Sequence, residues 1–259
     1  MFSNEDRVIY QKNPLGEVIC QIRFPQILMI ETEIPASFQE AVRDDFPRYS
    51  TRKECPAPKI TGIPGNLSLE NPPKTVNHLF VSDDGAWRIN LTSQYISLAC
   101  NRYTCWEDFA EKLDKPLAAF IKIYKPAYFE RVGLRYINFI SRKALDLDGV
   151  PFRELITPAY LGLLGEDNVT EAGIGRCSVD AELPIRSGCR VKLHAGPGII
   201  RGRNQQDTEV KFVLDFDLFM PGKVPVNFAA GALQTLHSQA WPLFRGAITD
   251  KLHNALDFM

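Results

Sequence analysis

Arginines on two alternating segments offer the clearest chemistry in this sequence. In the stretch EVICQIRF, alternation places Glu17 and Arg23 on the same face. In the stretch YFERVGLRYINFI, it places Arg131 and Arg135 on the same face. If the two stretches form paired strands, one carboxylate and three guanidinium groups meet on one face of a sheet.

Two interpretations of this arginine cluster are open. The favoured one is an internal ion-pair network, because arginines that leave water require carboxylate partners. The other is a site for a phosphate, a nucleic-acid backbone or an acidic partner, because a guanidinium group binds oxyanions through two parallel hydrogen bonds.

Other reactive residue types lack the spacing that a known site requires. Among the four histidines and six cysteines there is no Cys-x-x-Cys or His-x-x-x-His pair, so we expect no metal site and reduced core thiols. His237 is a candidate base, but it lies one turn before Trp241 on a helical pattern, which favours a packed histidine. Since no nucleophile elbow, dinucleotide fingerprint or Walker motif is present, we assign no catalytic residue and expect no cofactor.

Acidic residues form a further candidate site. Asp215 and Asp217 share a face of one alternating segment, and Asp180 and Glu182 lie outward on another. Such a patch could hold a cation. We favour a solvated sheet face on which these carboxylates meet basic side chains such as Lys192.

The elements that position these residues follow from hydrophobic periodicity. Period-two alternation predicts strands at 17–24, 78–81, 87–91, 95–100, 128–140, 176–185, 190–194 and 209–219. Apolar stripes predict two long helices, one over 104–124 and one from Asn227 almost to the last residue, each with an internal proline. Residues 1–13 are polar and predict a partly ordered lead-in, whereas 50–76, with five prolines, predicts a long irregular excursion.

Together these elements predict an α+β fold in which antiparallel sheet is covered by long helices. We expect two α+β halves, 1–140 and 141–259, with a possible two-fold pseudo-repeat, or else one continuous domain. A length of 259 residues allows either arrangement to bury a core.

The composition argues against several classes of protein. A net charge of −1 and a pI near 6.4 are not those of a general nucleic-acid or membrane-surface binder. The start of the chain lacks the apolar core of a secretion signal, and no apolar run reaches the ~18 residues of a membrane span. We therefore expect a cytoplasmic protein with no membrane partner.

Several of these residues also resemble a known family. They are Asn13-Pro14-Leu15, Glu17-Val18, Arg23-Phe24, the block Arg131-Val-Gly-Leu-Arg-Tyr-Ile-Asn138, His237, Phe244, Ile248-Thr249 and Leu252. The pattern is similar to a sporadically distributed bacterial family that has no assigned function. The resemblance implies a cytosolic bacterial protein of the accessory, mobile-element or defence-associated kind, and it brings no catalytic residue with it.

Three functions remain open from the sequence. The leading hypothesis is a non-enzymatic binding or accessory protein that recognises a protein partner or an anionic ligand. Its contact candidates are the 50–76 excursion and seven residues, namely Glu17, Arg23, Arg131, Arg135, Tyr136, Asn138 and His237. The alternative is an enzyme for a phosphorylated or nucleotide-like substrate, which needs a pocket where an arginine of the cluster meets His237 or Glu17 as a base. Nucleic-acid binding is third, because the sequence lacks an aromatic platform and a basic surplus.

Overall fold

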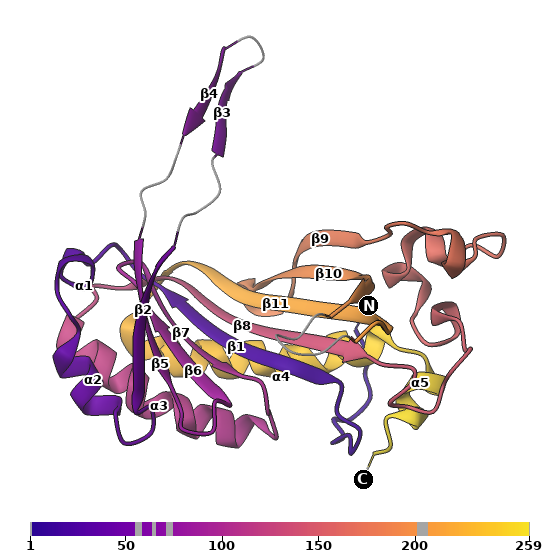
Figure 1. Ribbon diagram of the computed structural model, residues 1–259, viewed down its shortest axis with the longest axis horizontal. Helices are drawn as coiled ribbons and strands as arrows, with labels where there is room; N and C mark the ends of the chain where they lie inside the picture. The colour runs from indigo at the N-terminus through magenta and orange to yellow at the C-terminus, as the bar shows by residue number, and fades with distance from the viewer. Residues whose placement is uncertain (1, 55–58, 64–65, 71–74, 201–206, 259) are drawn as a thin grey trace.

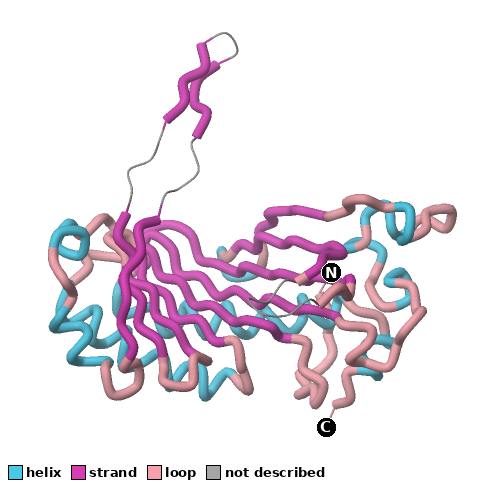
Figure 2. The backbone as a smooth tube through the Cα atoms, viewed as in Figure 1, coloured by secondary structure: helices cyan, strands magenta, loops and turns pink. Residues whose placement is uncertain are grey.

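The computed structural model describes residues 2–54, 59–63, 66–70, 75–200 and 207–258, and they form an α+β fold around one large antiparallel sheet (Figure 1). Nine strands lie in the order β2-β5-β6-β7-β1-β8-β11-β10-β9. Their bounds are β1 Leu15–Arg23, β2 Arg48–Glu54, β5 Thr75–Val81, β6 Trp87–Leu91, β7 Tyr95–Cys100, β8 Phe129–Ile140, β9 Val179–Pro184, β10 Arg190–Ile199 and β11 Val210–Val224. Figure 2 shows this sheet running across the molecule. The predicted α+β class with an antiparallel sheet is confirmed.

The strand β8 connects the two parts of the sheet. It pairs with β1 along one edge and with β11 along the other, in both cases antiparallel. Arg23 lies opposite Arg131, and Ile19 lies opposite Arg135, so the strand pairing on which the arginine cluster depends is present. The strands on both sides of β8 share one sheet and one hydrophobic core. The division at residue 140 and the two-fold pseudo-repeat stay predictions.

The two longest helices of the described chain lie on the same side of the sheet (Figure 1). The helices are α1 Leu28–Thr32, α2 Ala36–Val42, α3 Trp106–Tyr124, α4 Ala229–Ala247 and α5 Asp250–Ala255. α3 buries Phe120, whose ring centre lies 4.7 Å from that of Phe24 just after β1. α4 packs against β8 and β11 through a stripe that includes Leu236 and Leu243. We call the side of α3 and α4 the helix face and the opposite side the open face.

The 50–76 excursion is more regular than its sequence predicts. β2 occupies 48–54 and pairs with β5, and a separate two-stranded ribbon forms from β3 (Lys59–Ile63) and β4 (Asn66–Glu70). This ribbon extends away from the sheet (Figure 1). The five prolines obscured the pattern, yet none lies within these strands, where a missing N–H group would break the ladder.

None of the helices in the described ranges combines the length and the apolar character needed to cross a lipid bilayer.

Candidate functional site

The block 131–138 of β8 divides between the two faces of the sheet. Tyr136 and Asn138 lie on the helix face and are 6 % and 3 % exposed. Arg131 and Arg135 lie on the open face, where they reach carboxylates of β11. The seven residues nominated from the sequence therefore form two groups. Glu17, Arg23, Arg131 and Arg135 belong to the open face, whereas Tyr136, Asn138 and His237 belong to the helix face.

On the open face, each arginine of β8 forms an ion pair with an aspartate of β11. Arg131 Nη2 donates to Asp217 Oδ1 at 2.6 Å. Arg135 donates through Nε and Nη2 to the two oxygens of Asp215, at 2.8 and 2.5 Å. Hydrogen bonding to Asp215 raises the pKa of Arg135 above its usual value. These contacts fit the ion-pair network, and they use the two aspartates that the sequence placed in a separate acidic patch.

Gly133 provides the space that Arg131 needs. A β-carbon at Gly133 would collide with the guanidinium group of Arg131, which lies over the backbone at that point. The same guanidinium group lies 4.5 Å from the centre of the Phe219 ring on β11. The glycine between the two arginines therefore lets Arg131 reach across to Asp217.

The open-face residues of β1 have other partners. Glu17 accepts a hydrogen bond of 2.8 Å from Arg88 of β6. The small side chain of Ala99 lies opposite Arg88 on the strand between them. Arg23 is exposed and forms no ion pair with a carboxylate in the described part of the chain. The hydrogen-bonded partner of Glu17 is therefore on β6, while its charge also helps to raise the pKa of Arg135 on β8.

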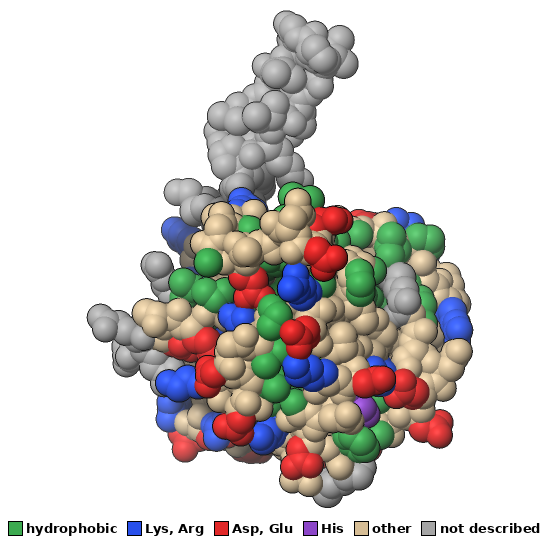
Figure 3. All heavy atoms as spheres, turned by 90° about the vertical axis from the view of Figure 1, so that its right-hand side faces the viewer, with side chains coloured by type: hydrophobic (Ala, Val, Ile, Leu, Met, Phe, Trp, Pro, Cys, Tyr) green, Lys and Arg blue, Asp and Glu red, His purple; other side chains and the backbone are tan. Residues whose placement is uncertain are grey.

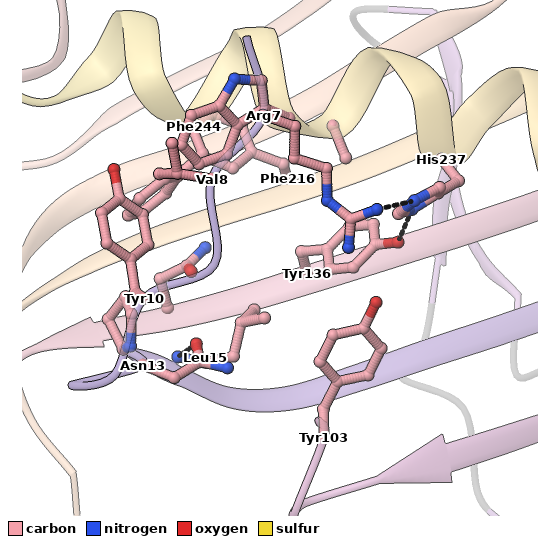
Figure 4. Close-up of a pocket in the computed structure, with 14 residues that line it drawn as sticks. Arg7, Val8, Tyr10, Asn13, Leu15, Tyr103, Tyr136, Phe216, His237 and Phe244 are labelled. Carbon is pink, nitrogen blue, oxygen red and sulfur yellow. Dashed lines mark hydrogen bonds between the residues drawn. The ribbon is translucent and has the colours of Figure 1, made fainter. Parts of the chain in front are cut away.

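On the helix face, a cavity of about 100 Å³ lies between β8, α4 and residues 7–15 (Figure 4). Its lining includes Tyr136, Asn138 and His237, so three of the nominated residues meet at one place. Most of the remaining wall is aromatic or aliphatic and comes from Tyr10, Leu15, Tyr103, Phe216, Trp241 and Phe244. Arg7 carries the one formal charge among the described residues of this lining.

Three side chains from separate parts of the chain form a hydrogen-bonded series at the cavity (Figure 4). His237 of α4 contacts Arg7 Nη1 through Nε2 at 3.2 Å and the Tyr136 hydroxyl through Nδ1 at 2.9 Å. A guanidinium group can only donate, so Nε2 accepts, and the neutral ring carries its proton on Nδ1. Nδ1–H then donates to the Tyr136 oxygen, which leaves the Tyr136 proton for a further acceptor.

Burial keeps the titratable groups of this series uncharged. The ring of His237 stacks on Trp106 with centres 4.6 Å apart. Desolvation and the neighbouring Arg7 lower the pKa of His237 to about 4, although Glu107 opposes the shift. Desolvation raises the pKa of Tyr136 well above its usual value and that of Tyr103 to about 12. At neutral pH the cavity therefore presents neutral hydrogen-bonding groups and the cation of Arg7.

The N-terminal segment (residues 2–13) forms one wall of the cavity and is fastened to the last two helices. Arg245 Nε donates to Glu5 Oε2 at 2.7 Å, and Trp241 Nε1 donates to the Glu5 carbonyl at 3.2 Å. Farther along, the Tyr10 hydroxyl lies 2.7 Å from His253 Nδ1. The sequence predicted only a lead-in here, because these contacts join residues more than 230 positions apart and leave no local pattern.

Asn138, a further polar group of the cavity, is held by the sheet. Asn138 Nδ2 donates to the Leu214 carbonyl of β11 at 3.0 Å, which fixes the orientation of its amide. Within the described ranges, no three histidine, cysteine, aspartate or glutamate side chains gather as a metal site would require.

A scan against protein-family models finds no match for this chain, and a search of curated proteins finds none either. The resemblance to the sporadically distributed bacterial family stays a prediction.

Proposed function

We propose that this chain is a non-enzymatic binding protein whose ligand occupies the cavity beneath the N-terminal segment. The observation that carries the proposal is the series Arg7–His237–Tyr136, in which three distant parts of the chain direct polar groups at one aromatic cavity. A few fixed polar groups in an otherwise apolar concave site are typical of small-molecule sites.

The chemistry of the cavity supports binding in preference to catalysis. A general base works best when its pKa lies near the working pH, whereas the pKa of His237 is about 4. Its Nε2 lone pair is also already used by Arg7. The enzyme alternative needs an arginine of the cluster beside His237 or Glu17 as a base. Arg131 and Arg135 lie on the opposite face of the sheet from His237. Glu17 lies on their face but is hydrogen-bonded to Arg88.

Size and charge support a small ligand. The cavity of about 100 Å³ is smaller than one of roughly 150 Å³ that binds benzene, so it encloses no more than one ring and is far too small for a nucleotide. On the side of the molecule shown in Figure 3, acidic and basic side chains are interspersed and no large area has one sign. This distribution offers no support there for nucleic-acid binding, which requires a basic surface.

Filling the cavity tests the proposal. Ala240 lines the cavity from α4, and Ala240→Phe places a ring in the ligand space. Ala118→Phe, at an exposed position of α3, is the matched control. Benzoate and benzyl alcohol are the probes, followed by saturation-transfer NMR. We expect at least one probe to bind the wild type and Ala118→Phe but not Ala240→Phe. Absence of binding to the wild type, or equal binding to Ala240→Phe, overturns the proposal.

A protein partner is the second candidate function, and the β3–β4 ribbon is the feature that favours it. An isolated two-stranded ribbon is marginally stable in water, and this one extends away from the sheet (Figure 1). We propose the ribbon as the surface that a partner contacts. Replacing 56–73 by a short turn should abolish co-purification of a partner from the native host while leaving probe binding in the cavity intact. Retention of that partner by the shortened chain argues against this role.

The proposal retains the bacterial, cytoplasmic and accessory setting that the family resemblance implies. It also retains the two-fold pseudo-repeat with long helices over the sheet. Support comes from α3 and α4, each of which has 19 residues, an internal proline and a position directly after a run of antiparallel strands.

A further inference from the structure

We infer that the ligand of this cavity is a small carboxylate with a flat apolar body of one ring, held by Arg7 at the cavity mouth. This inference rests on the proposed function and adds the chemical class of the ligand. Its basis is the charge, the hydrogen-bonding capacity and the shape of the cavity lining.

The charge of Arg7 is the first reason. Arg131, Arg135 and the buried Arg245 each pair with at least one carboxylate. Arg7 instead contacts a neutral imidazole, and it forms no ion pair with the described residues. No carboxylate lies among the described residues that line the cavity. Glu107, whose charge interacts with Arg7 and His237, lies outside this lining.

The hydrogen-bonding capacity at the mouth is the second reason. A guanidinium group has five N–H donors in a planar fork, and the contact with His237 uses one of them. The fork matches the two oxygens of a carboxylate, and charge-assisted bonds of this kind are about twice as strong as neutral ones. The Tyr136 hydroxyl accepts from His237 and also interacts with the Tyr103 hydroxyl, so the two phenols form a neutral hydrogen-bonding edge beside Arg7. The Tyr136 hydroxyl and the Arg7 guanidinium group lie on the same side of His237 (Figure 4).

The shape of the cavity is the third reason. Tyr10 has its ring centre 5.6 Å from that of Trp241 and 5.9 Å from that of Phe244, so three aromatic rings form one wall. Phe216 and Leu15 contribute further apolar surface. Aromatic walls favour a flat ligand, and the volume of about 100 Å³ limits it to one ring. A benzoate-sized acid would place its ring against this wall and leave its carboxylate at Arg7, outside the enclosed volume of about 100 Å³.

Probes that differ only in charge test the inference. Benzoate, benzyl alcohol and benzylamine present an anion, a neutral group and a cation on the same ring, and titration calorimetry at pH 7 gives their dissociation constants. We expect benzoate to bind wild-type protein about tenfold more tightly than benzyl alcohol, and benzylamine to bind most weakly. Added salt should weaken benzoate binding and leave benzyl alcohol unchanged, because salt screens charge pairs at an exposed mouth.

Substitutions of two arginines test whether Arg7 causes the preference for benzoate over benzyl alcohol. Arg7→Gln should weaken benzoate binding by about tenfold without changing benzyl alcohol binding. Arg43→Gln removes an exposed arginine at the end of α2 and should change neither. Thermal unfolding of both variants confirms that they fold, which we expect because both residues are exposed.

The outcomes separate the two levels of the proposal. If benzyl alcohol or benzylamine binds as tightly as benzoate, or if Arg7→Gln leaves benzoate binding unchanged, the carboxylate inference is overturned while the ligand cavity remains supported. If no probe binds the wild type, the proposed function fails, and the carboxylate inference fails with it.

Discussion

Polar residues on the two faces of β8 have different kinds of partner. On the open face, Arg131 and Arg135 project toward Asp217 and Asp215, and each charge is matched by a charge of the neighbouring strand. On the helix face, Tyr136 and Asn138 meet a neutral imidazole and a backbone carbonyl. Adjacent positions of one strand therefore lie in an ion-pair network or in an uncharged cavity wall, according to the side of the sheet they face.

Because of this difference, the charged groups that stabilise the fold are not the ones available to bind a ligand. An arginine already paired with a carboxylate contributes to the fold but offers little charge to a ligand. The cavity on the helix face leaves Arg7, the one cation among the described residues of its lining, on a segment that reaches the cavity from outside the sheet. The conspicuous arginines of the sequence thus serve the sheet, whereas an inconspicuous arginine near the start of the chain lies where a ligand would meet it.

Removing one partner from the open-face network gives the largest expected effect on stability. Arg135→Met leaves the Asp215 carboxylate, 12 % exposed, without its partner. We expect the free energy of unfolding to fall by about 2 kcal/mol, less than for a fully buried pair because the Arg135 side chain is 44 % exposed. Urea denaturation measures the change, and benzoate affinity at the cavity should remain that of the wild type.

The matched control concerns the unpaired charge. Adding Asp215→Asn to Arg135→Met removes the carboxylate and should recover part of the lost stability, because a neutral amide is cheaper to bury than a lone charge. Arg153→Met at an exposed pair should cost under about 0.5 kcal/mol. If the Arg135→Met protein is as stable as the wild type, the ion pairs of the open face do not stabilise the fold, and the contrast between the two faces is wrong.

Local periodicity predicts much of this arrangement. Alternation in 17–24 and 128–140 identifies two strands and the residues that share each face, and their pairing follows in the structure. The same reasoning cannot find Asp215 as the partner of Arg135, because that contact spans 80 residues and depends on which strands become neighbours.

Two further features escape local patterns altogether. The N-terminal segment is polar and aperiodic, and its order comes from contacts with α4 and α5 near the other end of the sequence. The β3–β4 ribbon is hidden by the prolines that surround its short strands. The order of the N-terminal segment depends on tertiary contacts, and the ribbon strands are too short and too close to prolines to show a pattern. Hydrophobic periodicity reports only burial on one side of an element.

The titration of His237 gives an intermediate effect and tests the uncharged state of the helix face. Its pKa is about 4 in the folded protein, below its usual value of 6.5. Between these two values the unfolded chain binds more protons, so the free energy of unfolding should decrease as the pH falls from 6.5 toward 4. We expect His237 to contribute a loss of about 1–2 kcal/mol, because the ring is partly exposed and its field is screened.

The comparison of pH slopes isolates this contribution. Arg7, Tyr136, Trp106 and Glu107 are the groups around the ring, and His237→Gln leaves them all in place. Urea denaturation at several pH values should show a shallower slope for His237→Gln than for the wild type. Equal slopes for the wild type and His237→Gln mean that the helix face does not hold its histidine neutral.

Arg23→Ala should give the smallest effect. It tests whether an arginine stabilises the fold because it lies on the open face or because it pairs with a carboxylate. Arg23 lies directly opposite Arg131 in the β1–β8 pair, and like charges in that position repel. Since Arg23 is exposed and has no ion pair within the described chain, its removal should leave the free energy of unfolding unchanged or raise it by a few tenths of a kcal/mol. Arg131→Ala leaves the Asp217 carboxylate without its partner, so it should lower the free energy of unfolding in the same urea titration. If both variants lose stability equally, location on the open face matters more than pairing, and the network interpretation of that face must be abandoned.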